Sequence, residues 1–235
     1  MILVFLLEES DQNQEEEFNL FIHMARYLKS KTKLSKRVGR NLFLKGARSF
    51  SAKDDYSKRP YKAGMHGKNL QKGRISEYGK QLLEKQAIRF TYGLMERQLA
   101  NMFKKAFAKR GDTGKIVLNQ LERRLDNVVY KAGFANSRAQ ARQLVNHGHF
   151  TVNNVPVNIP SFVVKTGDVI RVKENKQKKN FWKNFQLEVP QETVAWISSN
   201  LSKKEFKIVN EPLDEDLPKD FNIQSVVEYY SRKVR

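Results

Sequence analysis

The sequence predicts an α+β protein, because helix-period segments and short β-type segments alternate along one chain of 235 residues. The strongest helical signal lies within residues 76–110, where apolar residues recur at intervals of four and three: Ile88, Tyr92, Met95, Leu99, Met102 and Ala106. Two shorter helix-period segments follow between residues 123 and 148, and β-type segments occupy residues 150–172. A strongly basic arm precedes all of them.

The charge of the chain indicates a polyanionic partner. Lys and Arg number 44 against 25 acids, which gives a net charge of +19 and a pI near 10. Such an excess repels itself in a compact state unless the working state includes a polyanion. Nucleic acid is the expected partner, because each neutralised phosphate releases counterions and strengthens binding. An anionic membrane is the rival, but neither a membrane-spanning apolar run nor a long basic amphipathic helix supports it.

The first residues have a charge opposite to that of the rest of the chain. Residues 1–23 contain six acids and no Lys or Arg, and their apolar start lacks the basic region of a signal peptide. We interpret residues 1–23 as an acidic extension that is either disordered or a misassigned start, with Met24 as the natural beginning. The chain has no cysteine, which excludes disulfides and thiolate metal sites, and nothing argues for export.

Residues 24–75 form the basic arm. Between residues 24 and 74 there are 16 Lys and Arg against two acids, and the apolar residues suffice for one short helix. Burial cannot then offset the ordering entropy, so we expect this arm to be disordered until it meets a polyanion. Inside it, a tight turn rich in donors supplies RNA-binding residues, with a merely flexible loop as the alternative interpretation: Gly64, His66, Gly67 and Lys68.

Residues 76–120 form a helical domain. Gly93 interrupts the apolar stripe, so we expect two helices rather than one. The Met and aromatic residues of the stripe pack in a core, and a cofactor role has little support. Arg89 and Arg97 lie on the outer faces and are counted among the RNA-binding residues.

Two short helices come next, each ended by a glycine. Gly133 and Gly148 follow the last helical residues, where a left-handed residue satisfies the terminal carbonyls. Ser137, with Gln140 three residues on, predicts a capping-box start for the second helix. His147 and His149, which flank Gly148, are expected to be turn residues that face solvent.

The second helix has two different faces, and one of them predicts phosphate binding. Ala141, Leu144 and Val145 form a packing face, whereas Arg138 and Arg142 lie one turn apart on an exposed face. Guanidinium groups pair bidentately with phosphate, and the N–H groups at the helix start favour an anion. Further residues extend this RNA-binding surface: Arg123, Arg124, Asn127, Ser137 and Gln143. The alternative is an ordinary solvated charged face.

The β-type segments predict a small antiparallel sheet. Phe150–Val152 and Val155–Val157 flank two asparagines, Asn153 and Asn154, which suit a tight hairpin. We expect further strands at Phe162–Val164 and Val169–Val172, and Pro156 argues for an edge position. Residues 176–235 are polar again and end in an amphipathic stretch.

Several segments, in order along the chain, together resemble one known family. They are Met24-Ala25-Arg26-Tyr27, Leu42-Phe43-Leu44-Lys45, Gly64-Met65-His66-Gly67, Ser76-Glu77-Tyr78-Gly79-Lys80, Tyr92-Gly93, Glu96-Arg97-Gln98, Arg124-Leu125-Asp126-Asn127, Arg138-Ala139-Gln140-Ala141-Arg142 and Val226-Val227-Glu228-Tyr229-Tyr230. From Met24 to its end the chain resembles the small-subunit ribosomal protein S-four family of bacterial and organellar type. Many members carry zinc-binding cysteines in the basic arm, and this chain departs from them by having none.

The resemblance implies both an architecture and a function. Residues 121–175 would be an αα-plus-antiparallel-β RNA-binding module inserted into the helical domain, to which residues 176–235 return. The protein would bind small-subunit ribosomal RNA at a multi-helix junction in the five-prime domain, nucleate subunit assembly and contribute to translation and its accuracy. Neighbouring small-subunit proteins, among them the one that lines the decoding side, would be its other partners. Its location would be the cytoplasm of a bacterium, or the matrix or stroma of an organelle.

Two other classes of function stay open. The same module accompanies catalytic domains in RNA-modifying enzymes, but the chain contains no P-loop, GxGxxG, HExxH or Cys nucleophile. We therefore predict no enzyme, no catalytic residues, no cofactor, no small-molecule substrate and no metal, since the four His residues lack metal-ligand spacing. A translational regulator that binds messenger RNA would use the same surface.

Overall fold

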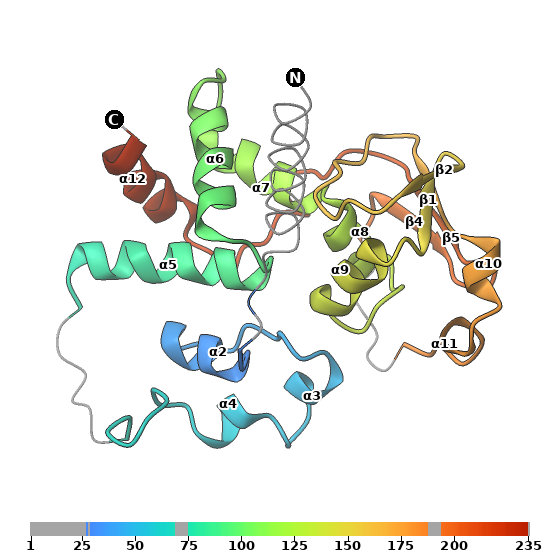
Figure 1. Ribbon diagram of the computed structural model, residues 1–235. Helices are drawn as coiled ribbons and strands as arrows, with labels where there is room; N and C mark the ends of the chain where they lie inside the picture. Colours follow the sequence, from blue (N-terminus) through green and yellow to red (C-terminus); the bar gives the residue numbers. More distant parts are fainter. Residues whose placement is uncertain (1–26, 28, 69–74, 188–193, 235) are drawn as a thin grey trace, which may run out of the picture.

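The helical domain is built from segments that are distant in sequence. Helices α5 (Glu77–Thr91), α6 (Glu96–Phe107) and α7 (Thr113–Glu122) pack with the C-terminal helix α12 (Ile223–Val234) around one apolar core. The Phe103 ring of α6 stacks on the Tyr230 ring of α12 at a centroid distance of 4.4 Å. The computed structural model describes residues 27, 29–68, 75–187 and 194–234, and the interpretation of residues 1–23 lies outside them. Figure 1 shows the helical domain beside the α+β module, with the arm running below α5.

The break that the sequence predicts at Gly93 is confirmed. Gly93 has a φ of +64°, and α5 ends at Thr91 while α6 begins at Glu96. The predicted stripe of core residues is confirmed except at Met95, which is the N-cap of α6 and is exposed. The turn at Gly93 changes the helical phase, so a continuous period places Met95 incorrectly.

The arm contains more structure than its composition predicts. Helices α2 (Thr32–Val38), α3 (Ala47–Phe50) and α4 (Asp55–Lys58) follow one another below α5. Leu34 and Leu42 are buried against Ala87 and Phe90 of α5, and these four residues form a small apolar cluster. The expectation of one short helix is therefore wrong for residues 29–68, which contain α2, α3 and α4. The buried apolar residues of the arm pack on α5, which supplies the apolar surface that the arm itself lacks.

The α+β module begins with two short helices and continues into a sheet. Helices α8 (Leu125–Lys131) and α9 (Arg138–Asn146) precede strands β1 (Phe150–Val152), β2 (Val155–Val157) and β3 (Val169–Val172). Asn153 and Asn154 have φ values of +49° and +67°, so the predicted hairpin is confirmed. Phe162–Val164 is not a strand, since it contributes only a single bridge between Val163 and Arg124.

The sheet extends well past residue 175. Strands β4 (Ile197–Asn200) and β5 (Glu205–Ile208) complete an antiparallel order β2-β1-β3-β5-β4 within the described residues, so β2 lies at an edge, as Pro156 predicts. Between β3 and β4 lie the short helices α10 (Glu174–Gln177) and α11 (Asn180–Lys183). The module core includes Trp182, Trp196, Phe206 and Ile208. Residues 176–187 and 194–208 therefore belong to the module, and among the described residues the helical core resumes at Leu217.

Candidate nucleic-acid interface

Helix α9 begins and ends as its sequence predicts. The Ser137 hydroxyl accepts a hydrogen bond from the Gln140 amide at 3.3 Å, and the Gln140 side-chain oxygen accepts from the Asn136 amide at 2.7 Å. In a standard capping box the Gln140 side chain would accept from the Ser137 amide, so this second bond is shifted by one residue. At the other end Gly148 adopts a φ of +61°. Ser137 and the exposed Gln143 therefore lie on a helix that is fixed at both ends.

Arg124 and Arg142 are not on an exposed face. The Arg124 side chain is buried and donates twice to Asp126, with Nε–Oδ1 and Nη2–Oδ2 distances of 3.1 and 2.8 Å. Arg142 is only 8% exposed, and its Nη1 lies 3.3 Å from the Gly93 carbonyl oxygen and 3.5 Å from Asp126 Oδ2. The expected exposure of Arg142 is wrong, and Arg124, which was expected to extend the same surface, is also buried, because one buried carboxylate binds both guanidinium groups.

A second buried carboxylate, Glu122, lies at the end of α7. It accepts from Lys131 Nζ at 2.6 Å, from Asn127 Nδ2 at 2.9 Å and from the Tyr92 hydroxyl. Burial, and then the Glu122 charge, raise the pKa of Tyr92 well above its ordinary range, so the phenol stays protonated and remains a donor. Asn127 is buried in this network, which corrects its placement on the RNA-binding surface.

Arg138 connects this network to the surface. Its Nε donates to Asn127 Oδ1 at 2.8 Å, and its guanidinium carbon lies 5.3 and 4.7 Å from the ring centroids of Tyr92 and Tyr130. The two carboxylate networks together join the helical domain to the module. We call this set of residues the domain joint: Tyr92, Glu122, Arg124, Asp126, Asn127, Lys131, Arg138 and Arg142.

The other predicted arginines have different environments. Arg123 donates from Nε to the Val164 carbonyl at 3.0 Å and from Nη1 to Glu211 at 2.7 Å, so it connects α7 to residues after the module. Arg89 is half-buried and pairs with Glu96 at 3.4 Å. Arg97 is exposed on α6. Of these three, Arg97 presents its side chain most openly to a ligand.

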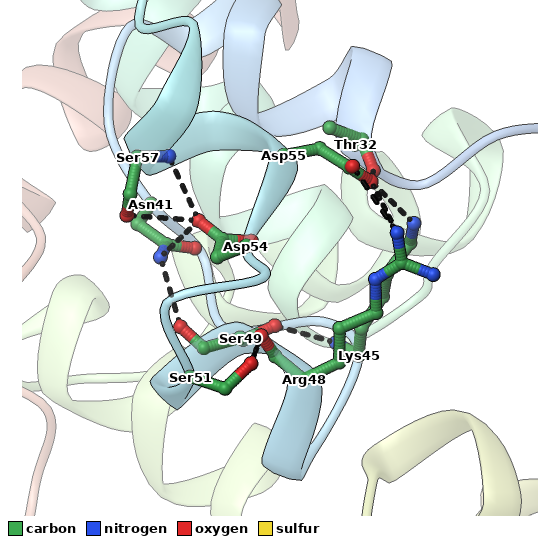
Figure 2. A network of polar contacts seen from close by, with 9 residues as sticks. All are labelled: Thr32, Asn41, Lys45, Arg48, Ser49, Ser51, Asp54, Asp55 and Ser57. Atoms are coloured by element: carbon green, nitrogen blue, oxygen red, sulfur yellow. Dashed lines mark hydrogen bonds and ion pairs between the residues drawn. The ribbon is translucent and has the colours of Figure 1, made fainter.

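The two acids of residues 24–74 organise the arm, as Figure 2 shows. Asp54 caps α4 by accepting from the Ser57 amide at 3.0 Å, and it also accepts from Asn41 Nδ2 at 3.2 Å. Asp55 accepts from Lys45 Nζ at 3.1 Å and pairs with Arg48 at 3.2 Å. The hydrogen bond from Lys45 is the main cause that lowers the pKa of Asp55. The arm thus acquires its turns from local polar contacts.

Glycines fix two turns of the arm. In the predicted turn, the Gly67 amide donates to the Gly64 carbonyl at 3.1 Å, and a Cβ on Gly67 would lie 1.8 Å from the Lys62 carbonyl oxygen. Around this turn His66 and Lys68 are exposed. Gly46 has a φ of +57°, and a Cβ there would lie 2.4 Å from the Asn136 carbonyl oxygen. The arm therefore contacts the module at the turn just before α9.

We expect Gly46→Ala to loosen the arm from the module. Alanine at Gly39, which has a φ of +83° and no atom near a new Cβ, should cost only the strain of a left-handed residue, about 1 kcal/mol. Alanine at Gly46 adds a less tolerated backbone conformation, at φ +57° and ψ −138°, and a clash with the Asn136 carbonyl, which together should cost roughly 1 to 3 kcal/mol more. Thermal melts of the two variants compare these costs. Equal losses of stability would contradict the close contact with Asn136.

A pocket of about 410 Å³ lies where the arm, the turn between α5 and α6, and the start of α9 meet. Lys29 and Lys31 line it from the arm, and Ser137, Arg138 and Gln143 line it from α9. Its apolar lining includes Tyr27, Phe43, Leu44 and Phe90. Several of the predicted RNA-binding residues thus share one cavity with basic residues of the arm, a convergence that the sequence did not reveal.

His149 does not face solvent as the sequence suggested. It is buried, and its Nδ1 accepts a hydrogen bond from Trp182 Nε1 at 2.8 Å. Burial lowers the pKa of His149 to about 4, and the charges of Lys176 and Lys179 act in the same direction. The imidazole is therefore neutral near pH 7, with its proton on Nε2. His147 is exposed, as expected.

The module should lose stability as the pH falls from about 6.5 toward 4. The pKa of His149 in the folded state lies below its ordinary value near 6.5, so protons bind preferentially to the unfolded state in this window. Urea midpoints measured by tryptophan fluorescence between pH 7 and pH 5 should fall. His149→Gln, which keeps an acceptor for Trp182, should reduce this dependence, whereas His147→Gln should preserve it. The opposite ranking of the two variants would contradict the assignment.

The described part of the chain supports neither a metal site nor a membrane-spanning helix. Among residues 27, 29–68, 75–187 and 194–234, no group of three or more His, Asp and Glu side chains could hold a metal ion. Within the same ranges, helices are too short or too polar to cross a bilayer.

Comparisons with known proteins match two consecutive parts of the chain. Residues 123–170 match the model of the S4 domain, and residues 26–122 match the model described as ribosomal protein S4/S9 N-terminal domain. The fold and these matches define an S4-domain protein of α+β class.

Curated relatives carry the identification further. The small ribosomal subunit protein uS4A of Clostridium novyi is 44% identical over 209 residues, which cover 89% of this chain and all of the relative. The uS4 proteins of Solidesulfovibrio magneticus and Thermodesulfovibrio yellowstonii are 45% and 42% identical over 210 residues, with the same coverage. The chain belongs to the uS4 family of small ribosomal subunit proteins. This membership confirms the resemblance seen in the sequence, and with it the prediction that the chain is not an enzyme.

Proposed function

We propose that this protein binds small-subunit ribosomal RNA directly, at a multi-helix junction in the five-prime domain, and thereby nucleates assembly of the small subunit. The observation that carries the proposal is the pocket, in which basic side chains of the arm face the capped start of α9. Structured RNA is recognised mainly through its shape, phosphates and 2′-hydroxyls. A cationic cavity between rigid elements suits a place where several RNA helices converge.

The proposed contact residues differ in part from those that the sequence suggested. Ser137, Arg138 and Gln143 remain, because they line the pocket. The exposed His66, Lys68 and Arg97 remain as contacts outside it. Lys29 and Lys31 join them from the arm. Arg124 and Asn127 are buried in the domain joint, so their effect on RNA binding is indirect. Arg142 also lines the pocket, but it is only 8% exposed and pairs with Asp126, so we assign it to the joint as well.

The joint explains how one protein can present a preorganised RNA surface. Asp126 binds Arg142 of α9, and Arg142 in turn donates to the Gly93 carbonyl between α5 and α6. These bonds fix α9 relative to the helical domain on which the arm packs. Rigid placement reduces the ordering cost of binding, which raises affinity without adding a contact.

The wider role follows the family. The relatives are named as small ribosomal subunit proteins of bacteria, so we propose a place on the ribosome in a bacterial cytoplasm, with an organelle as the alternative. Neighbouring small-subunit proteins are the proposed protein partners, and an influence on decoding accuracy would act through them. Binding of messenger RNA as a second activity would use the same basic surface.

A salt titration tests the proposal. Filter binding to a five-prime-domain fragment of small-subunit ribosomal RNA should be tighter than binding to an unrelated structured RNA of equal length. Lys29→Gln should flatten the dependence of log K on log salt by roughly 0.7 to 0.9, the amount expected for one lost phosphate contact. Lys207→Gln, at an exposed lysine of β5 that is not among the residues lining the pocket, is the matched control and should leave the slope unchanged. Equal affinity for both RNAs would contradict specific binding to the junction.

A further inference from the structure

Two exposed phenylalanines of the arm stack on each other beside the pocket. The ring centroids of Phe43 and Phe50 lie 4.8 Å apart with an interplanar angle of 17°. Phe43 and Phe50 are 46% and 57% exposed, and neither belongs to the small apolar cluster that the arm forms with α5. Paired aromatic rings that remain exposed on a folded segment are a candidate interaction site.

The backbone holds this pair in a fixed position. Phe43 has a φ of +48°, a conformation that a bulky side chain rarely adopts and that the surrounding structure must stabilise. Its amide donates to Asn41 Oδ1 at 3.0 Å, and Asn41 in turn donates to Asp54 at 3.2 Å, as Figure 2 shows for the latter pair. The close contact of Gly46 with Asn136 fixes the chain between the two rings. The network thus maintains a strained residue whose ring is exposed.

The surroundings of Phe43 contain the complementary groups that a nucleotide requires. Phe43 lines the pocket together with Tyr27, and the same pocket is lined by the cationic side chains of Lys29, Lys31 and Arg138. Aromatic side chains next to a cationic groove are the usual arrangement for unpaired nucleotides, because every base has a π-face and every nucleotide a phosphate. A neighbouring protein is a less suitable occupant, since 16 Lys and Arg against two acids in residues 24–74 favour a polyanion.

We propose that the Phe43–Phe50 pair is a stacking platform for the base of an unpaired nucleotide in the bound RNA. The phosphate next to that base lies among the cations of the pocket. The inference rests on the proposed function and adds to it a recognition element that is insensitive to salt. Contact with an extruded base also explains why a compact basic protein would select a junction, where unpaired nucleotides occur, over a continuous duplex.

Conservative substitutions distinguish the contribution of base stacking to affinity from the contribution of charge. Phe43→Leu and Phe50→Leu keep apolar bulk but remove the π-face, and each should weaken binding to the five-prime-domain RNA fragment roughly tenfold. The slope of log K against log salt should not change, because no phosphate contact is removed. Phe43→Tyr and Phe50→Tyr should restore the affinity. Tyr78→Leu is the matched control, since Tyr78 is 56% exposed and belongs to another aromatic pair, with Tyr229, on the helical domain.

A spectroscopic variant gives an independent result. Phe50→Trp adds an exposed indole to a chain whose own Trp182 and Trp196 are buried. Its emission should be quenched by the RNA fragment to an extent that wild type does not show. Unchanged affinity of both leucine variants, or loss of affinity with a flattened salt slope, would overturn the stacking platform. Failure of the wild-type protein to bind the fragment would instead refute the proposed function.

Discussion

Asp126→Ala should destabilise the protein by about 3 to 5 kcal/mol, because it removes one partner of a buried ion-pair network. The carboxylate of Asp126 binds Arg124 at 2.8 Å and lies 3.5 Å from Arg142, and all three side chains are buried. Alanine would leave two guanidinium groups without their counter-charge in a region of low water access. The free energy of unfolding from urea titration, followed by far-UV circular dichroism, measures the loss.

A surface ion pair provides the comparison. Lys80 pairs with Glu77 at 3.0 Å on the exposed first turns of α5, and Lys80→Ala should change stability by no more than about 0.5 kcal/mol. Trp182 and Trp196 both lie in the module core, so tryptophan fluorescence reports the module whereas circular dichroism reports mainly the helices. In the Asp126→Ala variant both signals should shift together if the joint couples the two parts. A loss below 1 kcal/mol would show that the arginines find other partners and that the joint is weak.

The sequence predicted the local features of α9 and of the hairpin because short-range chemistry determines them. Ser137 accepts from an amide three residues along the chain, and Gly148 adopts a left-handed conformation at the helix end. Asn153 and Asn154 likewise tolerate the positive φ values of a two-residue turn. Each feature depends on residues within one or two helical turns, so no knowledge of the tertiary fold is required.

The burial of Arg124 and Arg142 depends instead on contacts that a helical period does not encode. Arg142 lies off the apolar stripe of α9, which predicts exposure, yet another helix and the Gly93 turn cover that face. The sequence does contain a signal for buried ion pairs. Asp126 lies two residues after Arg124 and Glu122 two residues before it, in a chain with a large excess of cations. Acids in such a setting are suited to bind nearby arginines, and they compete with phosphate for them.

The structure of the arm likewise depends on contacts that its own composition does not encode. The apolar residues of the arm are few, but Leu34 and Leu42 pack on the apolar surface that α5 offers. The two acids of residues 24–74, Asp54 and Asp55, hold its turns and thereby position Phe43, whose exposure no pattern in the sequence predicted. The proposed RNA contacts of the arm therefore depend on a backbone that local polar bonds and α5 hold in place.

Phe206→Ala should cost about 3 to 5 kcal/mol, although Phe206 lies thirty-one residues beyond the predicted end of the module. Its ring packs 5.1 Å from that of Phe134, and Phe206 is almost fully buried in the module core. Strand β5 pairs with β3, so the polar stretch that follows residue 175 supplies an essential part of the sheet. The sequence does not indicate this strand clearly, because β5 has only four residues and alternates charged with apolar side chains.

Lys207→Ala is the matched control on the same strand. Lys207 is exposed on the opposite face of β5, so alanine there should change stability by no more than about 0.5 kcal/mol. Urea titration followed by tryptophan fluorescence should show the difference directly, because Trp182 and Trp196 belong to the core from which Phe206 is removed. If both alanine variants retained wild-type stability, β5 would not be part of the module, and its C-terminal boundary would lie near residue 175 after all.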